Sequence, residues 1–254
     1  MKCSADLRLV SVFITTLSGS SLLYAGGIQT LEPIEVTATS DDLAGVADAA
    51  TQGTVTRQQI ESRPLLRPGE LLETVPGLIV TQHSGDGKAN QYFLRGFNLD
   101  HGTDFATSLD DVPINMPTNG HGQGYTDLNF IIPELVDNVQ YRKGPYYADV
   151  GDFGSAGAAD IHYARILERG AVELGVGEYG YRRALLADSP ELGSGHFLYA
   201  LEAFHNDGPW DNPSDYRKLN SVFSYSQGDD KDWFQVSAML YKAEWDATDQ
   251  VPQR

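Results

Sequence analysis

The sequence predicts a compact α+β domain followed by the first antiparallel strands of a transmembrane β-barrel. Three features predict this architecture: an apolar N-terminal segment typical of export, a middle part that mixes short helices with short strands, and a last part that alternates apolar with polar residues. The composition agrees, because 26 Gly, 13 Tyr and 10 Phe among 254 residues are typical of β structure with many turns.

The charge balance excludes several classes of function. Lys and Arg together number 18 against 35 Asp and Glu, which gives a formal net charge of −17. A protein that binds nucleic acid or docks on anionic lipid headgroups needs a basic face, so neither partner is expected. The single cysteine, Cys3, excludes an internal disulfide and a cysteine-rich zinc site.

Residues 1–25 have the features of a secretory signal peptide. Lys2 and Arg8 precede an apolar run, and Ala25 stands before two glycines at a small-residue cleavage region. A short membrane anchor is the alternative, which Gly19 and several Ser and Thr residues in the run disfavour. We therefore expect cleavage close to Ala25 and export to a bacterial envelope.

Residues 26–54 are polar and small, and we expect them to form a flexible arm. Within the arm, residues 34–38 are β-prone, and Pro33 favours an extended backbone before them. Such a segment can add an edge strand to the sheet of another protein, or it can be an ordinary linker. The segment alone leaves both possibilities open.

Residues 55–163 are predicted to form the α+β domain. Short helices are expected over residues 56–60, where Thr56 and Gln59 can form a capping box, and over residues 67–75, before a Pro-Gly stop. The apolar runs predict strands over residues 78–82, 91–95 and 135–142, with a Gly-rich polar loop over residues 83–90.

Residues 170–254 are predicted to contain the barrel strands. Alternation is clear over residues 171–176, 196–203 and 218–225, and residues 232–245 carry aromatic side chains at both ends. Short turns alternate with longer polar loops, as in outer-membrane barrels. A soluble β-sandwich has the same alternation, but the signal peptide and the terminal aromatic residues favour the barrel.

These pieces resemble the plug domain and barrel start of TonB-dependent outer-membrane receptors. The matching motifs occur in the family's order: the helix–Val-Pro-Gly–strand opening over residues 71–80, Leu94-Arg95-Gly96-Phe97, the turn at residues 109–113, a segment over residues 136–145 that resembles the Val-Glu-Val-x-Arg-Gly-Pro signature, and the Gly- and Ala-rich exit over residues 154–161.

The sequence departs from the family pattern at three places, which indicates a divergent branch. Asp111 stands where Gly is usual, Lys143 is an extra residue before Gly-Pro, and residues 157–161 replace the usual Gly-Gly-x-Ile-Asn.

The resemblance implies roles for individual residues. The TonB box, to which the inner-membrane protein TonB adds as a strand, would be Ile34, Glu35, Val36, Thr37 and Ala38. The residues that fix the plug would be Arg95, Gly96, Arg142, Gly144 and Pro145. Both arginines are expected to be buried, and a buried guanidinium needs a carboxylate or several carbonyl groups.

The resemblance also implies energised import of a scarce ligand, such as a metal–siderophore or another metal complex, across the outer membrane of a Gram-negative cell. Plug loops would touch that ligand first, and the ligand-facing candidates are His83, Asp86, Lys88, Gln91, His121, Gln123 and Tyr125. The arm would lie in the periplasm, lipid would surround the barrel strands, and no cofactor is expected.

No catalytic motif is found, so an enzyme is not expected. The loops at residues 100–104 and 119–125 hold histidines, and the first also holds carboxylates; both groups can bind a divalent metal. Because these histidines are isolated in the sequence and are surrounded by glycines, we expect plain loops and no metal site.

Two other classes of function remain open. An exported β-rich hydrolase could use a carboxylate pair such as Asp110-Asp111, although adjacent side chains of an extended segment point to opposite faces. A structural or adhesive outer-membrane protein would bind no TonB and would not need residues 34–38.

Length adds two expectations. The family's barrel has about 22 strands, whereas the roughly 85 residues after the domain suffice for about five. The chain is therefore expected to be an N-terminal fragment of a receptor. Too few residues lie between Ala25 and Ile34 for a folded signalling domain.

Overall fold

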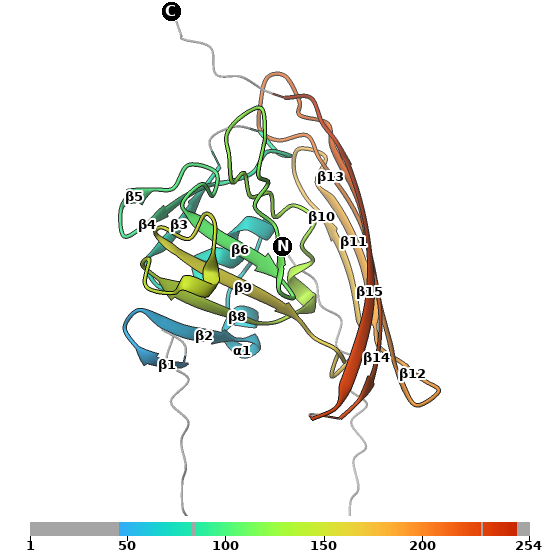
Figure 1. Ribbon diagram of the computed structural model, residues 1–254. Coiled ribbons are helices and arrows are strands. Elements are labelled where there is room, and N and C mark those ends of the chain that lie inside the picture. The colour runs from blue at the N-terminus through green and yellow to red at the C-terminus, as the bar shows by residue number, and fades with distance from the viewer. Residues whose placement is uncertain (1–45, 83–84, 230, 248–254) are drawn as a thin grey trace, which may run out of the picture. The chain divides into compact units, whose positions relative to one another are not determined.

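The computed structural model describes residues 46–82, 85–229 and 231–247 (Figure 1). The expected signal peptide, the segment at residues 34–38 and His83 lie outside these residues. The described part consists of an α+β domain, residues 46–167, and a sheet of long strands, residues 171–244, and both belong to one compact unit. Among the described residues, no helix has the length and apolar character needed to cross a membrane.

A six-stranded mixed sheet forms the centre of the α+β domain. Its order is β1-β2-β8-β9-β6-β7, and every neighbouring pair is antiparallel except β6 and β9, which are parallel. The strands are β1 (Val46–Ala49), β2 (Gln52–Thr56), β6 (Phe105–Leu109), β7 (Val112–Pro113), β8 (Val136–Lys143) and β9 (Gly157–Tyr163).

The sheet begins earlier in the chain than expected. β1 and β2 lie almost entirely within residues 26–54, which the sequence analysis assigns to the flexible arm, and β2 pairs with β8 from Gln52 to Thr56. Only Val55 of β2 is buried. The small and polar residues of β1 and β2 therefore carry little apolar signal, and pairing with β8 makes them strands.

The Gly- and Ala-rich stretch forms a central strand. In β9, Gly157, Ala159, Ile161 and Tyr163 are buried in strict alternation. A Cβ atom added at Gly157 would lie 2.4 Å from the carbonyl oxygen of Arg142, so the neighbouring strand leaves no room for a side chain. Small residues here permit close backbone approach.

Helical turns cover this sheet, together with a three-stranded sheet. The capping box expected at Thr56 is present, and the first helix is α1 (Arg57–Glu61). The expected second helix is a 3-10 helix, η1 (Pro68–Thr74), whose Leu71 and Leu72 are fully buried. The remaining elements are the 3-10 helices η2 (Pro133–Leu135) and η3 (Ala148–Val150), and strands β3 (Leu78–Thr81), β4 (Gln91–Leu94) and β5 (Phe97–Asn98).

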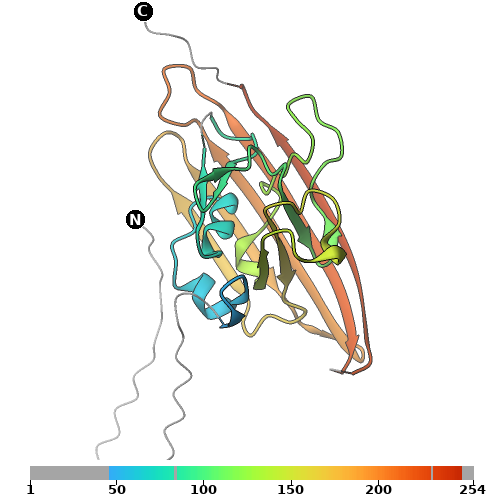
Figure 2. The same ribbon diagram turned by 60° about the vertical axis from the view of Figure 1, so that its left-hand side comes forward.

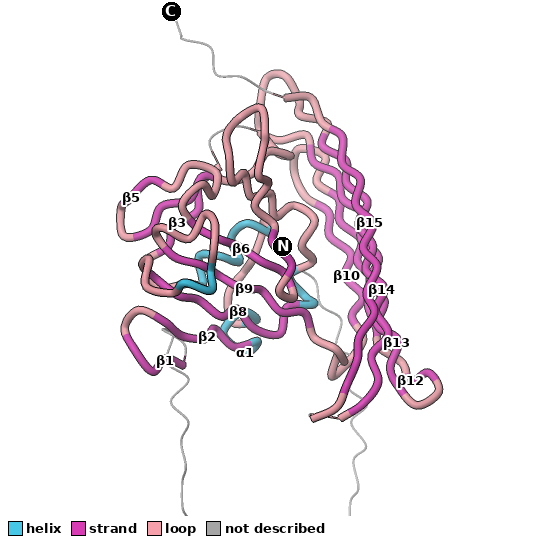
Figure 3. Tube along the Cα trace, in the orientation of Figure 1, coloured by secondary structure: helices cyan, strands magenta, loops and turns pink. Residues whose placement is uncertain are grey.

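The long strands form an antiparallel sheet in chain order (Figures 1 and 2). Figure 3 shows long strands joined by loops, without an intervening helix. The strands are β10 (Ala171–Val176), β11 (Arg182–Asp188), β13 (Gly195–Asn206), β14 (Tyr216–Gly228) and β15 (Trp233–Glu244), and β12 (Glu191–Leu192) pairs with the start of β13.

Burial alternates along these strands as the sequence predicts, most clearly in β14. β11 is absent from the expected strands, because two arginines open it and its next four residues, 184–187, are all apolar without alternation. The predicted fold class, an α+β plug followed by the first antiparallel strands of a barrel, is confirmed.

Candidate functional site

A charged cluster joins the α+β domain to the long-strand sheet. Arg183 on β11 donates two hydrogen bonds to Glu134 of η2, at 2.6 and 2.9 Å, and a third to Glu202 of β13, at 2.8 Å. Glu173 of β10 lies 3.3 Å from the same guanidinium. The bidentate geometry is the strongest form of Arg–carboxylate contact, so Glu134 and Arg183 fix the domain against the sheet.

Lys218 extends the cluster on the neighbouring strand. Its Nζ lies 2.8 Å from Glu202, and the two side chains are only 4% and 2% exposed. Lys218 also donates to the carbonyl oxygen of Asn129 at 3.3 Å, and Asn220 donates to that of Phe130. The inward face of these strands is therefore polar, as in the interior of an outer-membrane barrel.

The sequence analysis misses this cluster. Its signal is present in the strands, where Glu202 and Lys218 interrupt otherwise apolar or small positions. No local pattern pairs them with Glu134, because β11, β13 and β14 must first come together.

Arg95 and Arg142 take different places from those expected. Arg95 is exposed, at a turn between β4 and β5 with a positive φ of 53°. Its expected burial is therefore wrong, since the side chain at the apex of a tight turn points outward. Arg142 is half-buried and pairs with Asp149 at 2.5 Å, with its guanidinium over the ring of Tyr147. Both contacts lie within the α+β domain.

The other three plug-fixing candidates lie in turns. Gly96 and Gly144 have φ of 82° and 96°, which favours glycine, and Pro145 is exposed directly after Gly144. Lys143, the extra residue before Gly-Pro, is buried at the end of β8, and its ammonium group lies over the ring of Tyr141. Burial, together with the charge of Arg95, lowers the pKa of Lys143.

The loop at residues 85–90 contacts the ends of the long strands. Asp86 accepts a hydrogen bond from Asn206, the last residue of β13, and also one from Gln82. Gly87 packs against Trp245, whose ring would clash with any Cβ atom at this position. The carbonyl oxygen of Lys88 accepts from Asn129. This loop therefore bridges the domain and the loop ends of the sheet.

Gln91 is separate from the remaining candidates, since its amide donates to Asn98 across the β4–β5 hairpin. The backbone carbonyl oxygen of Gln123 accepts a hydrogen bond from the hydroxyl of Thr103. In Figure 1 the loop at residues 116–125 reaches the same end of the compact unit as the loop between β13 and β14.

His121 and Tyr125 meet His101, which the sequence analysis does not include among the ligand-facing residues. The ring centroids of His101 and His121 lie 4.3 Å apart, and that of Tyr125 lies 5.5 Å from His101 and 6.1 Å from His121. The histidines are 20 residues apart in the chain, so they only look isolated in the sequence. Oxygen and nitrogen atoms of Asp100, His101 and His121 lie within 4.8 Å of one another.

A second group of this kind lies on the sheet. Nε2 of His205 is 3.5 Å from Asp207 and 3.1 Å from Asp215. Arg217 already binds Asp215 through two hydrogen bonds, at 2.7 and 3.0 Å. The guanidinium supplies the positive charge that this carboxylate needs.

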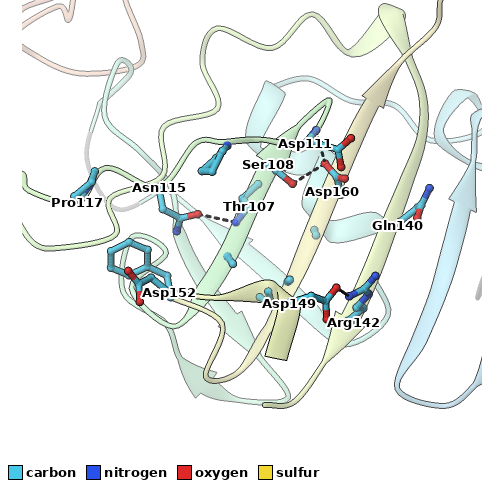
Figure 4. A pocket seen from close by; sticks show the side chains of 16 residues that line it. Thr107, Ser108, Asp111, Asn115, Pro117, Gln140, Arg142, Asp149, Asp152 and Asp160 are labelled. Atoms are coloured by element: carbon cyan, nitrogen blue, oxygen red, sulfur yellow. Dashed lines mark hydrogen bonds and ion pairs between the residues drawn. The ribbon is translucent and has the colours of Figure 1, made fainter. Parts of the chain in front are cut away.

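A polar cavity of about 540 Å³ lies over β6, β8 and β9 (Figure 4). Its lining carries four carboxylates against the single guanidinium of Arg142: Asp111, Asp149, Asp152 and Asp160. Ser108 donates to Asp160, and Asn115 accepts from the N–H of Thr107. The cavity can hold water and cations.

Next to this cavity, His162 of β9 is surrounded by carboxylates. Asp110 raises the pKa of His162 above its usual value, and Asp160 and Asp111 add to the effect, while burial opposes it. Nε2 lies 3.3 Å from Asp160, and Nδ1 lies 3.8 Å from Asp110. The imidazolium form therefore stabilises three neighbouring carboxylates.

Comparison with known proteins identifies a matching family for the α+β domain. Residues 46–158 match the family model described as the TonB-dependent Receptor Plug Domain. A curated relative, the vitamin B12 transporter BtuB of Vibrio vulnificus, is 26% identical over 228 residues, which are 86% of this chain and 36% of that protein.

Solved structures share the fold at lower identity. The copper transporter OprC is 20% identical and superposes with a TM-score of 0.58 over 80% of this chain and 32% of its own. The ferric yersiniabactin uptake receptor FyuA of Yersinia pestis is 18% identical, with a TM-score of 0.57 over 74% of this chain and 31% of its own. The chain thus spans about a third of the length of these relatives. Residues 46–158 therefore correspond to a TonB-dependent receptor plug domain, and the chain is similar to TonB-dependent receptors.

Proposed function

We propose that this receptor imports a scarce metal-containing ligand across the outer membrane, with energy supplied through TonB. The observation that carries the proposal is the plug domain itself, attached to the long-strand sheet by polar contacts. We take its loops at residues 85–90 and 116–125 to be the ones that face the ligand. The relatives are named as transporters or receptors.

Ligand binding would act on the plug through its loops. Asp86 binds Asn206 and Gly87 packs on Trp245, so a ligand that displaces either strand end moves the loop at residues 85–90. The polar contacts of Glu134, Asn129 and Phe130 with the sheet can be exchanged for water contacts. A polar interface of this kind permits the plug to shift, whereas an apolar interface of equal area would oppose the movement.

The arm would couple this shift to TonB. Residues 34–38 would add to a sheet of TonB through backbone hydrogen bonds, which need little side-chain specificity. The described chain begins at β1, an edge strand of the plug sheet, so a pull on the arm would reach the sheet directly. The arm would accordingly lie in the periplasm and the strands in the outer membrane.

The class of ligand is inferred from the relatives and the loops. The names of the relatives give vitamin B12, copper and ferric yersiniabactin as their cargo, and all three contain a metal. The loop cluster of His101, His121 and Tyr125 offers nitrogen and aromatic groups to such a ligand.

The test is an uptake assay with the receptor expressed from its complete gene. Val36→Pro removes a backbone donor and fixes φ within the TonB box, so it should abolish uptake while binding at the cell surface persists. Leu43→Pro, in the arm but outside residues 34–38, is the matched control and should import normally. Normal uptake by Val36→Pro would rule out the role of this segment.

The hydrolase alternative finds little support at Asp110 and Asp111. Both residues have a positive φ, 47° and 64°, in the turn between β6 and β7. Asp110 accepts from the N–H of Tyr163, and the N–H of Asp111 lies 3.4 Å from Asp160. These contacts are those of a structural turn. An adhesive protein without transport would be supported if neither the wild-type nor the Val36→Pro receptor imported a ligand.

A further inference from the structure

We propose that Asp100, His101 and His121 form a binding site for a divalent transition-metal ion of the zinc class on the plug domain. The proposal rests on the proposed function in one respect, because it takes the bound ion to be cargo that the receptor captures. The binding itself depends only on the side chains described below.

Hydrogen bonds to the backbone fix the tautomer of His101 and leave the lone pair on Nε2. Nδ1 lies 3.0 Å from the carbonyl oxygens of both Ala89 and Asn90. A carbonyl oxygen only accepts, so Nδ1 carries the proton, and in the neutral ring Nε2 carries the lone pair. A backbone carbonyl in this position is the usual second-shell partner of a metal-binding histidine.

Nε2 of His101 faces a carboxylate. It lies 3.7 Å from Oδ1 of Asp100, while the His101 side chain is 5% exposed and that of Asp100 is 52% exposed. A metal cation bound between this nitrogen and the carboxylate would be stabilised by both groups. The ring of His121 meets that of His101 edge-on at 4.3 Å and is exposed to solvent. An ion from solvent can therefore reach all three groups.

Hydrogen bonds hold the two loops in register. Nδ2 of Asn115 lies within 3.0 Å of the carbonyl oxygens of Gly102, Phe105 and Gly124, and Asn115 is buried. The N–H of Thr126 donates to the carbonyl oxygen of His101 at 2.8 Å. The loops that carry His101 and His121 are thus joined independently of any ligand, which lowers the cost of assembling a site.

The donor set and its dimensions suit zinc. Two imidazoles and one carboxylate are typical ligands of this ion, with bonds of about 2.0–2.2 Å that put ligand atoms roughly 3.4 Å apart in a tetrahedron. The separation of 3.7 Å between His101 and Asp100 is close to this value. The separations that involve His121 are at most 4.8 Å, and a rotamer change of this exposed side chain can shorten them. A fourth position remains for water or an exchanging ligand, as a capture site needs.

The cluster at His205 is the internal comparison. There Arg217 binds both carboxylate oxygens of Asp215, so a cation would have to displace a guanidinium. At Asp100, the ionisable side chain in contact is the imidazole of His101, at 3.7 Å. The two groups have similar ligands, and the structure favours metal at the first.

The test uses the receptor expressed from its complete gene, purified from outer membranes in detergent and stripped of metal with a chelator. Zn²⁺ is titrated calorimetrically, and Co²⁺ serves as a spectroscopic probe because four-coordinate Co²⁺ absorbs strongly in the visible range. His121→Ala and Asp100→Asn should each weaken Zn²⁺ binding about 100-fold or more, at least the loss caused by removal of an outer-shell partner. Mg²⁺ and Ca²⁺, which prefer oxygen ligands, should not compete.

His205→Ala is the matched control and should bind Zn²⁺ as the wild type does. His121 is exposed, so His121→Ala should keep the wild-type mobility on unheated gels, which separates loss of a ligand from loss of the fold. Unchanged Zn²⁺ affinity and Co²⁺ spectra in His121→Ala and Asp100→Asn would overturn the proposal, as would loss of binding in His205→Ala alone.

The Val36→Pro receptor separates this inference from the proposed function. It should bind Zn²⁺ normally, because binding needs no TonB. If it binds Zn²⁺ and also imports normally, the proposed role of residues 34–38 in import is wrong, and the proposed metal site remains supported. If uptake depends on residues 34–38 but substitution of Asp100 and His121 leaves the Zn²⁺ affinity unchanged, the proposed metal site is wrong and the proposed import remains supported.

Discussion

At the residue scale, buried charge is concentrated where the plug meets the long strands. Arg183 has a side chain that is only 11% exposed, and it is shared by Glu134, Glu173 and Glu202. Such a pair is weak evidence for net stability, because desolvation offsets most of the attraction. It is strong evidence that the pair fixes the position of the plug, since loss of one partner leaves an uncompensated buried charge.

Arg183→Ala should therefore loosen the plug. Removal of one partner of a buried pair costs about 3–5 kcal/mol. The variant also removes both hydrogen bonds to Glu134, which hold the domain against the sheet. We expect faster cleavage of the plug by a protease in the detergent-solubilised receptor. The neighbouring Arg182 is exposed, so Arg182→Ala should leave the cleavage rate unchanged.

The double variant Glu134→Gln with Arg183→Gln removes both charges and should recover part of the lost protection. Equal cleavage rates for Arg183→Ala and the wild type would contradict the role of the pair.

His162 gives the plug a pH dependence of defined sign. Asp110, with Asp160 and Asp111, raises its pKa in the folded state. The stabilisation is therefore fully present below the unfolded value of about 6.5 and is lost as the pH rises through the folded pKa. His162→Gln should destabilise the plug more at about pH 5.5 than at about pH 8.5, as measured by urea unfolding. A difference that stays constant over this range would contradict the assignment.

At the element scale, the first two strands matter more than their composition suggests. β2 pairs with β8 along its whole length and buries Val55, and β1 extends the sheet by one more strand. The C-terminal limit of the domain is also set by burial, since Ala164 and Leu167 belong to the core.

A protein spanning residues 46–167 should accordingly fold by itself as a soluble α+β domain, with a cooperative urea transition. A protein spanning residues 57–167 lacks β1 and β2 and leaves one edge of β8 without its partner. It should be less stable or should aggregate. Identical transitions for the two proteins would mean that β1 and β2 do not belong to the domain.

At the scale of the whole molecule, the long-strand sheet is open in the described residues, with β10 and β15 at its edges. Many apolar side chains of these strands are exposed, among them Val172, Leu174, Val236 and Leu240. Such a face is stable in lipid, but open edges are not, because backbone groups have no partner there.

The 254-residue chain expressed alone should therefore give no stable barrel. Refolded into detergent, it should run at the same position on gels with and without heating. A heat-modifiable, protease-resistant band of monomer size would show that these strands close by themselves, and the reasoning from open edges would fail.

The sequence by itself determined the fold class, the capping box at Thr56, the strands at residues 78–82 and 135–142, and the alternation of the later strands. These features depend on neighbours in the chain, on turn chemistry and on a period of two residues, so a local pattern is enough. The same holds for the plug motifs, which are short and occur in a set order.

Only the tertiary structure decided which distant residues meet. β1 and β2 are strands because β8 pairs with them, Glu134 finds Arg183 across two elements, and His101 meets His121 because Asn115 joins their loops. Arg95 is exposed because it lies at the apex of the turn between β4 and β5. The neighbouring residues in the sequence allow this turn but do not require it. Contacts of this kind follow from strand pairing and loop closure over many residues, and no local periodicity encodes them.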